Sequence, residues 1–383
     1  MTLEAVRITK NLIRRKSITP KDEGAIKLVA SYLKRLGFNC KILSFQEKGS
    51  AKVTNLYAQL GKGKNFCFAG HTDVVPPGNI KNWKYNPFSG IKKNGYLYGR
   101  GASDMKGSIA CFICAVKEFL SEQKNNFDGS ISLLITGDEE GSAINGTRKV
   151  LQWLKKNKKI MNVCLVGEPS NPNALGEMIK IGRRGSLNIR LKVFGLQGHV
   201  AYPKIADNPI TYLLKMLTKI KSNKWDNGNK YFDPSNLEIT SINVNNSAFN
   251  VIPAEASAEF NIRFNNKHSR QSIEKKIRTI CNSVYKKYSL TLELTGEPFL
   301  TRQGEFTKIV SNSITKITRK SPTLSTTGGT SDARFIHKYC PVVEFGLINK
   351  TIHAENECVK IKDLNSLTKI YKNILSSYFK ANL

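Results

Sequence analysis

Residues 66–76 read Phe66-Cys67-Phe68-Ala69-Gly70-His71-Thr72-Asp73-Val74-Val75-Pro76, and this stretch decides the fold. An apolar run typical of a buried strand stops at a glycine and then delivers a histidine and an aspartate. On an extended backbone His71 and Asp73 point to the same side, so one can bind a metal ion while the other orients it. We therefore interpret this strand end as half of a metal site.

The same pattern recurs twice further along the chain. The apolar run 131–135 leads into Gly137-Asp138-Glu139-Glu140-Gly141, and the run 163–166 leads into Gly167-Glu168-Pro169. In an open α/β sheet, residues that follow neighbouring strands gather at the carboxyl edge, where ligands bind. A glycine-rich loop, residues 99–107, adds Asp104 ahead of an apolar helix at 108–120.

The alternation of strands and helices predicts an α/β fold in which helices flank a mixed, mostly parallel sheet. Further strands are expected at 40–44, 53–60 and 342–345, and further helices at 3–15, 20–36 (with Pro20 near its first position), 305–318, 332–337 and 364–379.

The pattern changes near Gly182. Strands at 187–194, 239–244 and 255–264 and helices at 208–220 and 269–288 predict an inserted α+β two-layer sandwich. The expected domains are therefore a catalytic domain formed by 1–181 and 295–383, with 182–294 inserted.

Composition is that of an ordinary globular protein. The chain has 383 residues, 40% hydrophobic and 23% charged, which suffices for two domains without disulfide staples. The longest apolar run is too short to span a membrane, and the N-terminus resembles an amphipathic helix rather than a signal peptide. We therefore expect a cytoplasmic protein with reduced cysteines, including Cys111 and Cys114, whose CxxC pattern lies inside an apolar helix.

The formal net charge of +31 raises the alternative of a nucleic-acid or anionic-membrane partner. Lys and Arg are scattered over every expected helix rather than gathered in a stripe or tail with interleaved aromatics. We therefore expect no specific nucleic-acid or membrane partner, and we interpret the charge as a compositional bias. Carboxylates are scarce, 29 in all, which makes the run at 138–140 more informative.

The candidate chemical residues are two histidines and several carboxylates, namely His71, Asp73, Asp104, Glu139, Glu140, Glu168 and His353. This donor set suits zinc best, and it suits cobalt or manganese less well. It is too large for one closed tetrahedral ion, whereas a shared aspartate that bridges two ions uses it well. One of the adjacent glutamates can then bind a metal while the other acts as general base on a bridging water, which predicts hydrolysis of an amide bond.

The chain resembles the di-zinc metallopeptidase and deacylase family that includes aminoacylases and acetylornithine deacetylase. The resemblance rests on Gly70–Pro76, Gly99–Gly107, Gly137–Gly141 and Gly167–Pro169, which match the family's motifs in order over essentially the whole chain. It implies two Zn²⁺ per subunit, which Co²⁺ can replace, and a cis peptide after Asp104. It also implies a role for each metal ligand: a bridging Asp104, one site completed by His71 and Glu168, and the other completed by Glu140 and His353.

By the same resemblance, Glu139 is the general base, Asp73 holds His71, and His199 reaches from a partner subunit to stabilise the oxyanion together with the metal. The inserted domain is then a lid and dimerisation domain of a homodimer. His268 and His337 match no motif.

Within the family, the likeness is greatest to the enzymes that hydrolyse N-succinyl-L,L-diaminopimelate in lysine and cell-wall precursor synthesis. It rests on the stretches 182–186, 198–203, 250–254 and 327–335. The implied substrate-binding residues are Arg183, Ser186, Tyr202, Asn250, Arg263, Gly329, Thr330 and Asn349. The two arginines suit a substrate with several carboxylates, because a guanidinium fork binds a carboxylate bidentately.

Two alternatives stay open. The first is another amidohydrolase of the same family, such as an N-acetylornithine deacetylase or a dipeptidase. The second is a basic nucleic-acid-binding protein with an inactive site, which the filled ligand positions argue against.

Overall fold

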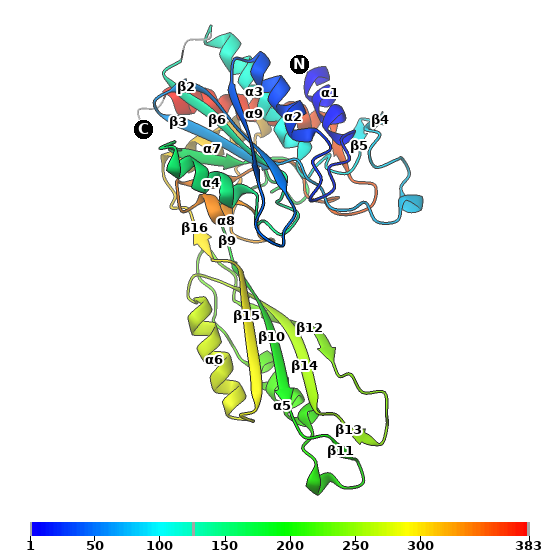
Figure 1. Cartoon of the computed structure of the whole chain (residues 1–383). Coiled ribbons are helices and arrows are strands. Elements are labelled where there is room, and N and C mark those ends of the chain that lie inside the picture. The colour runs from blue at the N-terminus through cyan, green and yellow to red at the C-terminus, as the bar shows by residue number, and fades with distance from the viewer. Residues whose placement is uncertain (1, 125–126, 381–383) are drawn as a thin grey trace. The chain divides into compact units, whose positions relative to one another are not determined.

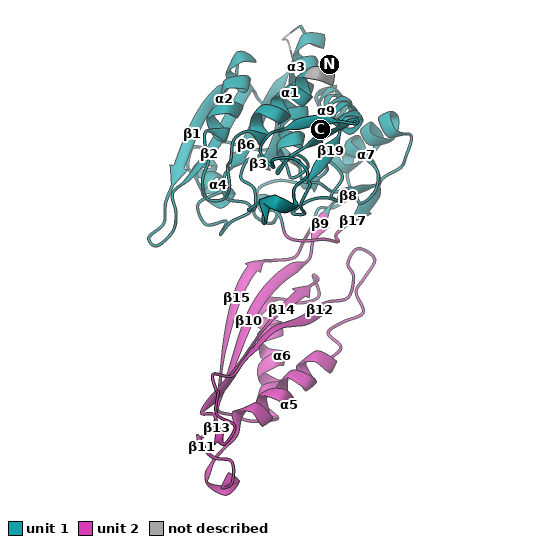
Figure 2. Cartoon of the chain, turned by 90° about the vertical axis from the view of Figure 1, so that its right-hand side faces the viewer, with its two compact units in different colours: residues 1–181, 301–325, 331–383 teal, residues 182–300, 326–330 magenta. Residues whose placement is uncertain are grey.

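The computed structural model describes residues 2–124 and 127–380, and the chain divides into two compact units (Figures 1 and 2). The first unit comprises Met1–Ile181, Thr301–Ser325 and Ser331–Leu383, and the second comprises Gly182–Leu300 and Thr326–Thr330. Both segments of the second unit are thus inserted in the first along the chain. Among the described residues, no helix combines the length and the apolar character that crossing a membrane requires.

The elements of the first unit follow the chain in two blocks. The first block contains α1 (Thr2–Ile13), α2 (Ala25–Arg35), β1 (Asn39–Phe45), β2 (Val53–Lys62), β3 (Asn65–His71), the 3-10 helix η1 (Ile80–Asn82), β4 (Ile91–Lys93), β5 (Tyr96–Tyr98), α3 (Lys106–Glu122), β6 (Gly129–Thr136), α4 (Thr147–Lys156), β7 (Val163–Val166) and β8 (Met178–Lys180). The second contains α7 (Glu305–Thr318), β17 (Thr323–Ser325), α8 (Ala333–Ile336), β18 (Val342–Glu344), β19 (Cys358–Lys360) and α9 (Ile361–Lys380).

An eight-stranded sheet with the order β1-β2-β6-β3-β7-β18-β8-β17 forms the centre of this unit. Its middle strands β6, β3, β7 and β18 are parallel, and His71 pairs with Thr136 while Ala69 pairs with Val166. The three strands that lead into candidate residues, β3, β6 and β7, are therefore neighbours and end at one edge of the sheet. The predicted mixed, mostly parallel sheet with flanking helices is confirmed.

Aromatic rings form the core between the sheet and helices α3 and α9. Phe68 stacks on Phe112 of α3 at 4.2 Å, and Tyr371 of α9 meets both rings edge-on. On the opposite face Trp153 of α4 packs against Tyr57, 5.8 Å away. Both faces of the sheet are thus buried, which explains why its central strands are continuously apolar.

Two glycines at the strand ends have a packing role rather than a turn role. A Cβ on Gly70 would lie 2.3 Å from the Met105 methyl group, and one on Gly167 would lie 2.5 Å from Phe68 and 2.7 Å from Met105. Met105 is fully buried and directly follows Asp104. The glycines therefore leave the space in which the loop carrying Asp104 is held against the sheet.

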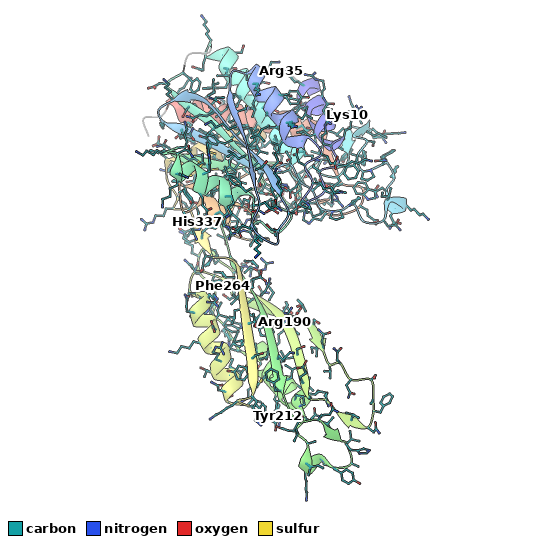
Figure 3. All side chains as sticks on the ribbon, viewed as in Figure 1. Lys10, Arg35, Arg190, Tyr212, Phe264 and His337 are labelled. Atoms are coloured by element: carbon teal, nitrogen blue, oxygen red, sulfur yellow. The ribbon has the colours of Figure 1, made fainter. Side chains whose placement is uncertain are left out.

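The second unit contains β9 (Gly182–Arg183), β10 (Gly185–Phe194), β11 (Gly198–His199), η2 (Pro203–Ile205), α5 (Pro209–Ser222), β12 (Asn236–Asn243), β13 (Val251–Ile252), β14 (Glu255–Phe264), α6 (Arg270–Asn282), β15 (Tyr288–Gly296) and β16 (Phe299–Leu300). Its antiparallel sheet has the order β12-β14-β10-β15, and apolar residues from alternate positions pack under α5 and α6. Figure 3 marks the buried Phe264 at the end of β14 and the exposed Arg190, which pairs with Glu259 at 2.6 Å. The predicted two-layer sandwich is confirmed.

Three predicted boundaries are wrong. The helix expected from Pro20 begins at Ala25, because the Asp22 carboxylate accepts hydrogen bonds from the Gly24 and Ile26 amides and so caps the helix after Pro20. The helix expected to reach 288 ends at Asn282, and residues 288–296 form the edge strand β15 instead. The predicted end of the insertion at 294 consequently falls inside a strand, whereas the compact unit continues to Leu300.

Candidate active site

All the predicted metal ligands lie in the first unit. His71 ends β3, Asp104 precedes α3, Glu139 and Glu140 follow β6, Glu168 follows β7 and His353 precedes β19. The peptide between Asp104 and Met105 is cis, as the resemblance implies. Residues from five separate segments therefore converge at one sheet edge.

The side chains approach one another closely. His71 Nε2 lies 3.1 Å from Asp104 Oδ1 and 3.6 Å from Glu168 Oε1. His353 Nε2 lies 3.3 Å from Asp104 Oδ2 and 2.8 Å from Glu140 Oε1. The two oxygens of Asp104 thus face different histidines, which is the geometry that a bridging aspartate requires.

Ligand atoms lie within 4.8 Å of one another in three groups: His71 with Asp104 and Glu168, Asp104 with Glu140 and His353, and His71 with Glu139 and Glu140. The first two share Asp104 and have the composition of the two sites that the resemblance implies. The third shows that Glu139 also comes within reach of the centre.

The residues present fit metal ions. Glu168 Oε1 is buried and accepts no hydrogen bond, so an acceptor oxygen without a donor points toward His71 and Asp104. Leaving such an oxygen unsatisfied is costly, and a cation between these groups would satisfy it. Imidazole nitrogens and carboxylate oxygens are the donors that zinc uses at catalytic sites.

The histidines and Asp104 stabilise one another's charges. Burial alone would lower the pKa of His71, but the carboxylates of Asp104, Glu168 and Asp73 raise it well above its usual value. Hydrogen bonds to Asp104 and Glu140 raise the pKa of His353 to about 10. Burial alone would raise the pKa of Asp104, but the two histidines hold it below its usual value.

The pKa values of Glu168 and Glu139 are shifted in the opposite direction from that of Asp104. Burial raises the pKa of Glu168 well above its usual value, and neighbouring Asp104 adds to this effect. Burial also raises the pKa of Glu139. Attraction to His71 lowers it in part, and repulsion from Asp332 and Glu140 raises it again. This edge of the sheet therefore concentrates more negative charge than its two histidines neutralise, and cations would relieve the excess.

Asp73 contacts His71 more closely through its backbone carbonyl than through its side chain. His71 Nδ1 lies 2.9 Å from the Asp73 backbone carbonyl and 3.6 Å from its carboxylate. A carbonyl oxygen only accepts, so Nδ1 carries a proton, which leaves Nε2 as the ring nitrogen that could bind a metal ion. The Asp73 carboxylate instead accepts the backbone amides of Glu139 and Glu140 at 3.3 and 3.0 Å.

The predicted substrate residues lie mainly in the second unit, in two groups. The first group lies at the β9 end of the sheet and contains Arg183, Ser186 and Arg263. Ser186 and Arg263 are register partners on β10 and β14. Arg183 donates to the Thr327 carbonyl at 3.1 Å, in the same segment as Gly329 and Thr330. His199 and Tyr202 are exposed, with rings 5.7 Å apart, and the Val200 amide donates to Asn250. Asn349 lies in the first unit.

These two groups are at opposite ends of β10. The strand runs from Gly185 to Phe194, a length of about 30 Å at ~3.3 Å per residue. His199 follows its far end, whereas Ser186 lies at its start. Within one subunit, therefore, a single small ligand cannot touch both groups.

Sequence patterns did not identify Arg100 and Glu357, which contact the loops of the candidate ligands: Glu357 accepts the Asp104 amide, and Arg100 donates to the His353 carbonyl. The sequence around Arg100 predicts only a glycine-rich loop, yet the side chains of Arg100 and Glu357 are almost fully buried and pair at 2.9 Å. The scarcity of carboxylates could have directed attention to Glu357, which lies four residues after His353. His268 contacts Asp226 in the second unit, and His337 follows α8; neither belongs to the metal groups.

Comparison with known proteins places the chain in a family. The model of peptidase family M20/M25/M40 matches residues 67–377. A succinyl-diaminopimelate desuccinylase of Pelagibacter ubique is 54% identical over 99% of this chain and 100% of its own length, and one of Rhodospirillum centenum is 52% identical over 99% and 98%.

Solved structures share the fold. An M20-family metallo-carboxypeptidase of Sulfolobus solfataricus aligns with a TM-score of 0.78 at 20% identity, over 99% of this chain and 100% of its own. A dinuclear metal-binding M20 peptidase of Bacillus subtilis aligns with a TM-score of 0.72 at 14% identity, over 99% and 98%. The chain therefore belongs to peptidase family M20/M25/M40 and is a metal-dependent amide hydrolase.

Proposed function

We propose that the protein hydrolyses N-succinyl-L,L-2,6-diaminopimelate to succinate and L,L-2,6-diaminopimelate, a step of lysine and cell-wall precursor synthesis. The convergence of His71, Glu168, Glu140 and His353 on Asp104 carries the chemical part of the proposal. The substrate is supported by relatives named succinyl-diaminopimelate desuccinylase, which are 46–54% identical over nearly the whole chain. A cytoplasmic location belongs to the proposal, because all eight cysteines are free thiols, which a reducing compartment maintains.

The chain's residues divide the reaction between them. Metal ions, proposed to be two Zn²⁺ that Co²⁺ can replace, would lower the pKa of the attacking water and polarise the amide carbonyl. Glu139 accepts the proton of that water and passes it to the leaving amine. The Asp73 carboxylate aids this role by fixing the backbone of Glu139 and Glu140. Arg183 and Arg263 are proposed to hold substrate carboxylates, with Ser186, Gly329, Thr330 and Asn349 as further substrate-binding residues of the same subunit. Tyr202 of the partner subunit and Asn250 of the partner subunit would complete the set, because they lie with His199 at the far end of β10.

The experiment for the substrate compares acylated amines at defined zinc concentration. We expect hydrolysis of the succinylated diaminopimelate to exceed that of N-acetylornithine and of dipeptides by orders of magnitude in kcat/KM. A hydrogen-bonding pocket discriminates strongly, because it rejects analogues that leave its buried polar groups unpaired. Preference for the acetylated amine or for a dipeptide would replace this substrate with another of the same family.

A homodimer forms the second part of the proposal, in which His199 stabilises the oxyanion in the partner's site. The separation of His199 from Ser186 along β10 supports it, since one subunit cannot bring both to one substrate.

Glu139→Gln should retain its metal and lose roughly 10²–10⁴-fold in turnover. His199→Ala should also keep its metal and lose roughly 10²–10³-fold.

Mixing the two variants tests the exchange of residues between subunits. A mixed dimer contains one site with both an intact Glu139 and the partner's intact His199, so random mixing should restore about one quarter of the normal rate. The measurement is turnover after co-refolding, with each variant refolded alone as the control. Failure of the mixture to recover, although dimers form, would show that His199 acts within its own subunit or has no part in catalysis.

A further inference from the structure

A buried ion pair lies beside the candidate metal ligands. The side chains of Arg100 and Glu357 are 2% and 1% exposed, and Arg100 Nη1 lies 2.9 Å from Glu357 Oε2. Burying two charges is unfavourable unless further hydrogen bonds satisfy their remaining donors and acceptors. What these two side chains bind besides each other therefore indicates what the pair is for.

The Glu357 carboxylate is the centre of the loop that carries Asp104. Its Oε2 accepts the Gly101 amide at 2.9 Å, and its Oε1 accepts the amides of Ser103 and Asp104 at 2.9 and 3.1 Å. The Glu357 backbone carbonyl accepts the Gly99 amide at 2.9 Å. The loop therefore wraps around one carboxylate, and the backbone nitrogen of the candidate bridging ligand is bonded to it directly.

The Arg100 guanidinium holds the other side. Its Nη1 donates to the Ala354 carbonyl at 3.1 Å, and its Nη2 donates to the carbonyls of His353 and Pro76 at 3.3 and 3.4 Å. The guanidinium also lies over the ring of Trp83 at 5.2 Å. His353 has a φ of 58°, a left-handed conformation that a residue with a Cβ adopts only where surrounding contacts impose it. The hydrogen bonds from Arg100 to this turn are such contacts.

We propose that Arg100 and Glu357 are a positioning pair that holds Asp104 and His353 at the spacing needed to bind one metal ion together. The two ligands are distant in sequence, and the pair joins their loops through backbone groups that no substitution of the ligands themselves would alter. A carboxylate suits the Asp104 side because it accepts several amides, and a guanidinium suits the His353 side because it donates to several carbonyls. The proposal rests on the proposed metal-dependent function.

Substitutions can weaken each half separately. Glu357→Gln keeps the shape of the side chain but replaces one acceptor oxygen with a donor, so the loop carrying Asp104 loses support. Because Asp104 faces both histidines, we expect the affinity for both ions to fall by roughly 10–100-fold. Arg100→Lys keeps the charge but lacks the planar fork, so it should weaken mainly the ion held by His353, by a similar factor.

Metal binding is the measurement, since it does not depend on substrate. Metal-free protein is titrated with Zn²⁺ against a chromophoric competitor, and with Co²⁺ while the visible absorption bands report the coordination geometry. Glu122→Gln is the matched control, because it removes one partner of an exposed ion pair with Lys372 in the same unit. The control should bind both ions like the unaltered chain.

The proposal would be overturned if Glu357→Gln and Arg100→Lys bind metal with the affinities of the unaltered chain and give its cobalt spectra, even at lowered thermal stability. The pair would then be purely structural. If Glu357→Gln does not fold, Glu357→Asp replaces it, and full affinity in that shortened variant together with Arg100→Lys has the same meaning. The proposed function fails separately: a chain that binds two ions and shows these losses but hydrolyses a different amide retains the positioning pair and loses only the substrate.

Discussion

Asp73 shows how a single residue serves a site through two different groups. Its backbone carbonyl fixes the tautomer of His71, while its side chain accepts the amides of Glu139 and Glu140. Burial raises the pKa of this carboxyl to about 6, against the opposing effect of His71 and the two amides. The spacing of His71 and Asp73 therefore predicts a partnership correctly, but the atoms that form it depend on the neighbouring loop.

Asp226 in the second unit gives a prediction for pH dependence. Burial alone would raise the pKa of Asp226, but hydrogen bonds from Ser235, Gly228 and Asn265 lower it from 3.8 to about 2. A lowered pKa stabilises the folded state above pH 3.8, and that stability is lost as the pH falls toward 2. We therefore expect the second unit of the unaltered chain to lose protection across this range.

Asp226→Asn should be less stable at neutral pH and should depend less on pH below 3.8. Hydrogen exchange of peptides covering residues 226–235, followed by mass spectrometry at several pH values, measures both effects. Asp233→Asn changes an exposed carboxylate in the same loop and should behave like the unaltered chain. An identical acid dependence in Asp226→Asn and the unaltered chain would refute the role of Asp226.

At the scale of elements, the ends of β3, β6 and β7 are well encoded by the sequence. Each strand is a short apolar run followed by a polar residue, and parallel pairing then brings the ends together without further information. The strand β15 is an element that local sequence patterns did not predict. Residues 288–296 alternate between half-buried and exposed positions at the edge of the sheet. The helix predicted at 269–288 extends to the first of them. Only pairing with β10 identifies them as a strand.

At the scale of the whole molecule, the two units should respond differently to metal removal. The raised pKa values of Glu139 and Glu168 reflect the burial of acids that cations would compensate, and all the candidate ligands belong to the first unit. Ligand binding stabilises the folded state by about 2.7 kcal/mol when the free ligand is at roughly 100 times its Kd. Chelation should therefore abolish turnover and destabilise the first unit selectively.

Hydrogen exchange of the intact chain can separate these responses. Peptides around residues 66–73, 100–105 and 353–357 should lose protection after chelation and regain it with Zn²⁺ or Co²⁺. Peptides from β10 and α5 in the second unit are the internal control and should not change. Equal changes in both units, or none in either, would contradict the assignment of the metal centre to the first unit alone.

The sequence by itself determined the α/β class, the inserted sandwich and the identity of the candidate ligands, because strand periodicity and strand-end residues are local patterns. The tertiary structure decided which atoms meet. The loops 99–104 and 353–357 are joined by a buried ion pair, and Met105 occupies the space left by Gly70 and Gly167. The two groups of predicted substrate residues in the second unit are separated by the length of β10. Such contacts join residues far apart in the chain, and a local pattern carries no information about them until the sheet has paired.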